Sequence, residues 1–212
     1  MDLSRKEILQ LLAVIAVAAL LSMLLQTSRP LGENVGGNAL ALAVRNDRSS
    51  PADGPSTADL TLIVFTDYRC PACRAAYPAM TRAIARDRKV HIVYKDWPVF
   101  GEASERAAAV AIASDFQDIY PLVHDRLMTG RADSDAALRA AVEGAGGNWR
   151  TLQRDLSANR ARIDAAIERN TMQAFGLGLG GTPGYLIGPI LIRGALTEAE
   201  FTRAFKQARE AS

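Results

Sequence analysis

The stretch LTLIVFTDYRCPAC, residues 60–73, decides the fold. Its first half, residues 60–66, is almost continuously apolar and rich in β-branched side chains, which is typical of a central strand covered on both faces. The pair Cys70 and Cys73, spaced C-x-x-C, follows at once, and a helical pattern then runs over residues 74–86. Pro71 suits the first turn of this helix, because a missing N–H costs nothing there.

A second strand is predicted at residues 90–94 (VHIVY). A strand, a helix and a strand within about 35 residues make a βαβ unit, so we expect the two strands to be parallel and joined by a right-handed crossover. Residues 102–175 then follow a helical pattern.

The strand pattern returns at residues 185–187 and 190–192, on either side of Gly188-Pro189, and predicts a hairpin. A last helix is expected over residues 197–208. The element order therefore indicates an α/β fold: a βαβ unit, a helical block, and then a ββα unit.

Length and composition narrow the class of protein. The chain has 212 residues, enough for one ordinary domain or one domain with an insertion. Its 25 basic and 23 acidic residues give a net charge of +2. This balance argues against nucleic acid as a partner, because binding usually needs a basic patch or stripe. Two cysteines are too few for a disulfide-stapled mini-fold or a multi-cysteine zinc array.

Residues 8–25 form an apolar run broken only by Gln10 and Ser22, with Arg5 and Lys6 just before it. As a helix the run would be about 27 Å long, close to the thickness of a bilayer core. Preceding positive charges place the following chain outside the cytoplasm. We predict a signal-anchor, transmembrane helix over residues 1–27 rather than a cleaved signal peptide, because no small-x-small cleavage motif follows the run directly.

Export would place the C-x-x-C pair in an oxidising compartment. We therefore expect a bacterial-type cell envelope location, with the domain anchored in the inner membrane and facing the periplasm, or free in the periplasm if the signal is cleaved. Residues 28–58, rich in Gly, Pro, Asn and Ser, indicate a flexible tether. Within it Leu40, Leu42 and Val44 alternate, which suggests a short edge strand or a dimerising arm.

The predicted position of Cys70 at a helix start favours thiol chemistry. Unpaired backbone N–H groups and the positive end of the helix dipole stabilise a thiolate there. Cys70 is therefore the expected nucleophile, and Cys73, one turn further along, the resolving thiol. Arg69 and Arg74 flank the pair and would favour the thiolate if either approached the sulfur.

Two other interpretations of the pair are a zinc site and a purely structural disulfide. Zinc would need two more ligands, and the two histidines, His91 and His124, lie 33 residues apart without ligand spacing. We expect no metal, and no cofactor other than a redox-active Cys70–Cys73 disulfide. His124 is expected on the surface or at a hinge of the helical block.

Four segments together resemble a known family. The segment FTDYRCPAC, residues 65–73, is similar to the strand and active-site segment of the DsbA-like thiol–disulfide oxidoreductases of the thioredoxin superfamily. VYKDWP at 93–98 resembles their second strand and its exit, GTPGY at 181–185 their cis-proline loop, and RGA at 193–195 the end of their hairpin.

The resemblance implies a thioredoxin-like domain over residues 59–212, with an inserted all-helical subdomain at about 101–175. It also implies a cis Thr182–Pro183 peptide bond facing the cysteines, in a loop that binds substrate. An extended client segment would pair with the backbone there as an added strand.

The chain departs from the family pattern at two places. Many members carry a buried acid six residues before the first cysteine, where this chain has Val64. That acid can take the proton of the resolving thiol, so the proton path to Cys73 is open to question. Lys95 matches a lysine that often partners the acid; it could act alone, through water, or with Asp67 or Asp96, or extend its ammonium to solvent.

The second departure is the dipeptide Pro71-Ala72 between the cysteines, where strongly oxidising members carry Pro-His. Because Ala72 cannot stabilise the reduced thiolate as a histidine does, the resemblance implies a milder oxidant. Pro71, Ala72 and Lys95 are thus the expected redox-tuning residues.

The sequence predicts an enzyme that forms disulfides in exported, cysteine-containing client proteins, recycled by a redox partner in the membrane. Reductase and isomerase activities of the same fold remain alternatives. A binding module of a different class, chaperone-like or capturing Cu(I) on the thiolates, is another.

Overall fold

The computed structural model describes residues 5–27 and 30–211 and divides the chain into two units, residues 1–30 and 31–212. Helix α1 (Arg5–Thr27) belongs to the first unit. Among the described residues, no helix combines the length and the apolar character needed to cross a bilayer. The membrane anchor expected over residues 1–27, of which residues 1–4 lie outside the described part, is therefore not confirmed.

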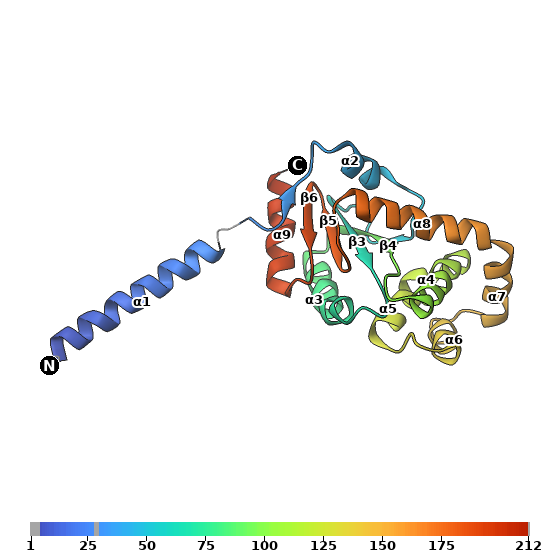
Figure 1. Cartoon of the computed structure of the whole chain (residues 1–212), viewed down its shortest axis with the longest axis horizontal. Coiled ribbons are helices and arrows are strands. Elements are labelled where there is room, and N and C mark those ends of the chain that lie inside the picture. The colour runs from blue at the N-terminus through green and yellow to red at the C-terminus, as the bar shows by residue number, and fades with distance from the viewer. Residues whose placement is uncertain (1–4, 28–29, 212) are drawn as a thin grey trace. The chain divides into compact units, whose positions relative to one another are not determined.

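The second unit is built on a six-stranded sheet in the order β1-β6-β5-β3-β4-β2. Figure 1 labels its four central strands, β6, β5, β3 and β4. Two of these are β3 (Leu60–Thr66) and β4 (Val90–Asp96), which pair in parallel. Leu60 lies opposite Val90 at one end of the pair, and Thr66 lies opposite Asp96 at the other. The predicted βαβ unit is thus confirmed. The predicted hairpin is also present, with β5 (Gly184–Ile187) and β6 (Ile190–Arg193) antiparallel to each other and β5 antiparallel to β3.

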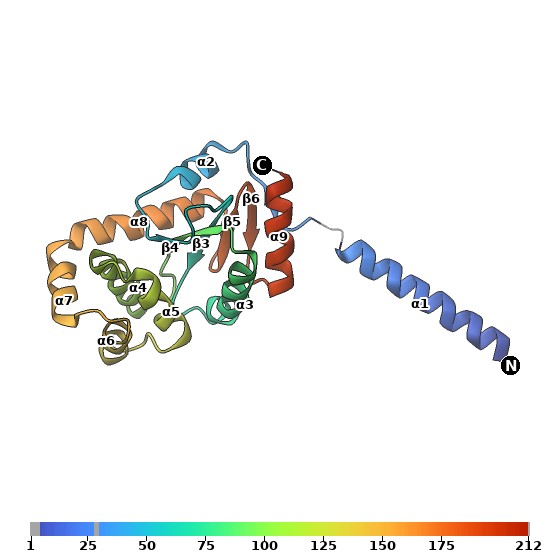
Figure 2. The same cartoon turned by 180° about the vertical axis from the view of Figure 1, so that it is seen from behind.

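Helix α3 (Pro71–Asp87) forms the crossover, and α9 (Glu198–Glu210), which begins with a capping box at Thr197 and Glu200, packs beside it. The predicted helical insertion consists of α4 (Glu102–Ser114), the short 3-10 helix η1 (Asp115–Gln117), α5 (Tyr120–Thr129), α6 (Asp135–Gly144), α7 (Trp149–Ala158) and α8 (Arg160–Gly176). Figure 2 shows α4 to α7 gathered on the β4 side of the sheet, whereas α9 lies on the β6 side.

Because successive strand residues point to opposite faces, the sheet has two distinct cores. The first face carries Leu62, Val64 and Tyr94 and packs against α3, α9 and the insertion. The second carries Ile63, Phe65 and Val93 and is covered by α2 and the end of α8. Both cysteines lie in the first core.

The flexible tether expected over residues 28–58 is wrong for residues 31–53, which form an ordered strap. In the strap, β1 (Glu33–Asn34) pairs with β6, α2 (Ala39–Asn46) covers the second face, and β2 (Ala52–Asp53) pairs with β4. Residues 28–29 lie outside the described residues.

The edge strand suggested at Leu40–Val44 is also wrong, because this stretch is helical. Asn38 caps the helix by accepting hydrogen bonds from the N–H groups of Leu40 and Ala41. The buried side chains are Ala41 and Val44, which are three residues apart and therefore share one helix face.

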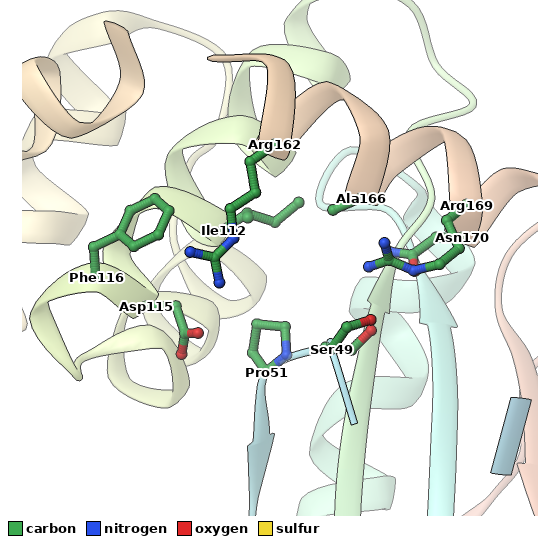
Figure 3. A pocket seen from close by; sticks show the side chains of 10 residues that line it. Ser49, Pro51, Ile112, Asp115, Phe116, Arg162, Ala166, Arg169 and Asn170 are labelled. Atoms are coloured by element: carbon green, nitrogen blue, oxygen red, sulfur yellow. The ribbon is translucent and has the colours of Figure 1, made fainter. Parts of the chain in front are cut away.

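A cavity of about 90 Å³ lies between the strap and the insertion (Figure 3). The strap contributes Ser49 and Pro51, and helix α8 contributes Arg162, Arg169 and Asn170. None of the site residues predicted from the sequence lines it. The predicted redox site therefore lies elsewhere in the domain.

Candidate active site

The loop between β3 and α3 is held by the carboxylate of Asp67, which is buried. This carboxylate accepts the backbone N–H groups of Arg69 (2.7 Å) and Val99 (2.6 Å) and the hydroxyl of Ser104 (2.8 Å). It thereby joins the segment that leads into the cysteines to the segment that follows β4. Asp67 is consequently fully engaged in fixing the loop.

Cys70 is the N-cap residue of α3, as the sequence predicts. Its Sγ accepts the N–H of Cys73 at 3.5 Å, so the sulfur takes up one of the free donors of the first turn. Both residues are free thiols in the structure and nearly buried, with exposed fractions of 3% for Cys70 and 2% for Cys73. A thiolate on Cys70 would face the positive end of the helix dipole.

The second wall of the site is the loop before β5. The Thr182–Pro183 peptide bond is cis, as the resemblance implies. The Cys70 thiol lies 3.3 Å from the carbonyl oxygen of Thr182, so residues 112 positions apart meet at this sulfur. Pro183 is in turn held by its carbonyl, which accepts the N–H of Gly194 at 2.9 Å.

Cys73 lies in a low-polarity environment. Burial raises the pKa of its thiol to about 12, although the hydroxyls of Thr66 and Thr182 beside it act in the opposite direction. Val64, at the position of the family's buried acid, contributes no proton acceptor. Cys73 therefore needs a base from elsewhere if it is to react near neutral pH.

Lys95 pairs with neither Asp67 nor Asp96, so these two expected partners are wrong. Its side chain is fully buried rather than extended to solvent, and its ammonium lies 2.6 Å from the carboxylate of Asp47 in the strap. Lys95 pairs in register with Phe65 and so shares the second face of the sheet, whereas Val64 lies on the first. The lysine fixes the strap rather than facing Cys73.

This ion pair is desolvated and hydrogen-bonded. Burial lowers the pKa of Lys95, while Asp47 acts in the opposite direction. The pKa of Asp47 is well below its usual range, because the raising effect of burial is outweighed by hydrogen bonds from Lys95, Ser49 and Gln173.

Within the described part of the chain, neither arginine beside the cysteines makes a hydrogen bond to a cysteine sulfur. The Arg74 guanidinium donates to the carbonyl oxygens of Tyr68, Leu127 and Gly130, and so ties the start of α3 to the end of α5. Arg69 is exposed.

A buried polar cluster that the sequence analysis missed lies behind the active-site loop, made of Asp96, Tyr120, Tyr68 and His124. The Tyr120 hydroxyl donates to Asp96 Oδ2 at 2.9 Å, and the Tyr68 hydroxyl lies 3.2 Å from the Tyr120 hydroxyl and 2.9 Å from His124 Nδ1. Three elements supply these residues: β4, α5 and the active-site loop.

His124 is therefore not a surface or hinge residue. It is 1% exposed and stacks on Tyr120, with ring centroids 5.7 Å apart. Burial lowers the pKa of its imidazole to about 3, so the ring is neutral at ordinary pH. The i, i+4 spacing of Tyr120 and His124 places them on one helix face, the one signal in the sequence that could have paired them.

Several apolar side chains lie in or next to the 97–100 segment, whose backbone N–H groups at Val99 and Phe100 bond Asp67. Trp97 is buried and contacts the rings of Phe65 and Phe175, whereas Val99, Phe100 and Phe175 are more than two-fifths exposed. Over residues 5–27 and 30–211, no group of three or more His, Cys, Asp or Glu side chains is placed to hold a metal ion.

Comparison with known proteins agrees with this geometry. The family model described as Thioredoxin matches residues 47–207. A thioredoxin-like oxidoreductase from Silicibacter pomeroyi is 33% identical, with a TM-score of 0.74, over 82% of this chain and 99% of that one. A periplasmic thioredoxin-like protein from Salmonella enterica serovar Typhimurium is 30% identical, with a TM-score of 0.71, over 82% and 98% of the two chains.

A third solved structure is the thiol-disulfide exchange protein alpha-DsbA2 from Wolbachia pipientis, 25% identical with a TM-score of 0.72 over 82% of this chain and 97% of that one. Among curated proteins, none matches the chain. The matched family model spans the end of the strap, strands β2 to β6, the insertion and most of the final helix. The chain therefore belongs to the thioredoxin family, as a DsbA-like member of the thioredoxin superfamily.

Proposed function

We propose that the protein exchanges disulfides with exported, cysteine-containing proteins through the Cys70–Cys73 pair. The observation that carries this proposal is the position of the Cys70 sulfur. It lies at the first turn of α3, accepts the Cys73 N–H, and faces the Thr182 carbonyl at 3.3 Å. A nucleophilic thiol, a resolving thiol and a backbone edge for an extended client thus meet at one point.

In the proposed reaction, a client thiolate attacks Cys70 of the oxidised pair, and Cys73 leaves as a thiol. A second client thiolate then attacks the mixed disulfide, so the client leaves oxidised and Cys70 leaves reduced. The client backbone would pair beside Thr182 and Pro183 as an added strand. The exposed rings of Phe100 and Phe175 offer apolar contacts to its side chains.

We infer that the protein forms disulfides rather than removing them, and that it is a mild oxidant because Ala72 stands between the cysteines. The chemistry needs no cofactor beyond the cysteine pair. It does need a redox partner that reoxidises the pair, and we propose that this partner lies in the membrane. Reductase and isomerase activities are the alternatives that the reduction potential distinguishes.

We propose a location in the bacterial-type cell envelope. The solved relative from Salmonella is described as periplasmic. The apolar run at residues 8–25, preceded by Arg5 and Lys6, supports export with the domain on the periplasmic side. Anchoring through this run, rather than cleavage, is tested by extracting membranes with carbonate: an anchored chain stays in the pellet at its full mass.

Trapping of mixed disulfides tests the exchange activity. The Cys73→Ser variant should accumulate disulfide-linked client proteins, because the resolving thiol is gone. The Cys70→Ser variant should accumulate none. Non-reducing gels followed by mass spectrometry check both outcomes in an envelope extract from the host.

The reduction potential of the pair then decides the direction. A value toward about −120 mV supports client oxidation, and one toward about −270 mV supports reduction. Metal capture would be the function instead of disulfide exchange if two results were found together. The protein would bind Cu(I) stoichiometrically and lose it in either cysteine variant, and Cys73→Ser would form no mixed disulfides.

A further inference from the structure

We propose that Asp96, at the end of β4, is the proton acceptor and donor for the resolving thiol of Cys73. This inference rests on the proposed exchange function and supplies the base that Val64 does not provide. Asp96 does not contact the reacting sulfurs. It is a proton-holding residue that acts on Cys73 through neighbouring hydroxyl groups.

The sheet register brings Asp96 to the correct face. Thr66 and Asp96 are the last aligned pair of the two parallel central strands, so their side chains leave the sheet side by side on one face. This face is the one that carries Val64, Tyr94 and the cysteines. The Thr66 hydroxyl lies beside the Cys73 thiol. Thr66 is therefore a neighbour of both Asp96 and the sulfur, and its hydroxyl is the group we propose to relay the proton.

The carboxyl group of Asp96 is buried and only half engaged. Its Oδ2 accepts the Tyr120 hydroxyl at 2.9 Å, whereas its Oδ1, also buried, has no hydrogen-bond partner among the described residues. An acceptor left free inside a protein is costly, so its presence calls for an explanation. A carboxyl oxygen held open at this point is suited to receiving a proton.

The groups around Asp96 come from three elements. The active-site loop contributes the Tyr68 hydroxyl and the Asp67 carboxylate, and α5 contributes the Tyr120 hydroxyl, with neutral His124 behind Tyr68. Asn170 of α8 donates to the Asp96 backbone carbonyl at 3.1 Å.

These surroundings set the titration of Asp96. Burial raises its pKa to about 7; the hydroxyls of Tyr68 and Tyr120 lower it, and the charge of Asp67 raises it. A base with a pKa near the working pH exchanges protons most effectively.

The proposed step balances in both directions. When Cys73 resolves a mixed disulfide, its S–H proton passes to the Asp96 carboxylate, and the thiolate attacks Cys70 Sγ. The bond between Cys70 and the partner sulfur breaks, the Cys70–Cys73 bond forms, and the partner leaves as a thiolate. When a client thiolate opens the pair at Cys70, the leaving Cys73 sulfur receives the proton back from Asp96.

The test separates the two thiols kinetically. The reduced full-length protein is mixed with excess oxidised glutathione, quenched in acid at set times between pH 5.5 and 8.5, and analysed by mass spectrometry. Formation of the Cys70–glutathione adduct depends on glutathione concentration, whereas its resolution by Cys73 does not. In the wild type, resolution should slow as the pH falls below about 7, because Asp96 becomes protonated.

The Asp96→Asn variant should lose this inflection and resolve the adduct about a hundredfold more slowly at pH 7, while forming it at an unchanged rate. The Tyr120→Phe variant removes a hydrogen bond that favours the carboxylate, so its inflection should move to higher pH. A purely structural role for Asp96 would not shift that inflection. The Asp125→Asn variant is the matched control, because it removes an acid of the insertion that bonds the Tyr77 hydroxyl at 3.0 Å.

An Asp96→Asn profile with the wild-type inflection, or an equal loss in Asp125→Asn, would overturn the assignment while leaving disulfide exchange intact. An unmoved inflection in Tyr120→Phe would overturn it even if Asp96→Asn fails to fold. A wild-type protein that forms no glutathione adduct at all would instead remove the exchange function on which the assignment rests.

Discussion

At the scale of single residues, the position of one sulfur organises the site. Cys70 caps a helix with its side chain, so the N–H of Cys73 and the helix dipole act on the same atom. Ala72, between the two cysteines, is exposed and brings neither charge nor a hydrogen-bond donor to that sulfur. Ala72 is therefore the position at which a substitution would most readily change the reduction potential.

The Ala72→His variant should be more oxidising than the wild type by about 30–60 mV. An imidazole beside Cys70 stabilises its thiolate, which belongs to the reduced form, and 30 mV corresponds to about 1.4 kcal/mol. Equilibration with glutathione followed by thiol trapping measures the change. Ala75→His, exposed one turn further along α3, is the control and should leave the potential nearly unchanged; equal shifts in both variants would contradict the explanation.

At the scale of elements, the strap is tied to the sheet by a charge. Asp47 follows α2 and holds the ammonium of Lys95 on the second face, with Arg169 of α8 at 3.3 Å from the same carboxylate oxygen. Three segments distant in the sequence thus meet at one anion. A buried charge that loses its partner is far more costly than an exposed one.

Replacing Asp47 by Asn should therefore lower the free energy of unfolding by about 3 kcal/mol, because Lys95 is left buried without a counter-charge. Glu143→Gln breaks the exposed i, i+4 pair with Arg139 and should cost less than about 0.5 kcal/mol. Urea unfolding compares the two. The double variant Asp47→Asn with Lys95→Met should regain most of the loss, and similar costs for Asp47→Asn and Glu143→Gln would refute the role of burial.

At the scale of the whole molecule, the unit that carries the site begins at residue 31 rather than at residue 59. The strap adds a strand to each edge of the sheet and buries Ala41 and Val44 against the second face. The boundary of the stable unit therefore lies before the strap.

A chain that lacks residues 1–30 should keep the melting temperature and the reduction potential of the full domain. A chain that lacks residues 1–53 loses β1, α2, β2 and the Lys95 counter-charge, and should lose a large part of a total stability that is about 5–15 kcal/mol for a typical domain. Circular dichroism melts of the two truncations check this. Equal melting temperatures would mean that the strap is dispensable.

Much of this protein follows from local patterns alone. The apolar run of β3, the C-x-x-C pair at a helix start, the hairpin and the capping box of α9 depend on residues a few positions apart, and the sequence is sufficient to predict them. The alternation of Leu40, Leu42 and Val44 is also a local pattern, but the strand it predicts is wrong. The segment is a helix that buries Ala41 and Val44 and leaves Leu42 exposed.

Only the tertiary structure decides which residues far apart in the sequence are in contact, because the sequence around each of them does not indicate its partner. Asp47 and Lys95 are 48 positions apart, and Tyr68 and His124 are 56 apart. Strand register decides which sheet face Lys95 lies on and places Asp96 beside Thr66. A shift by one residue would move Lys95 to the other face and separate Asp96 from Thr66. Register and burial are set by the packing of the complete core, and burial then sets the pKa values of Asp96, His124 and Cys73.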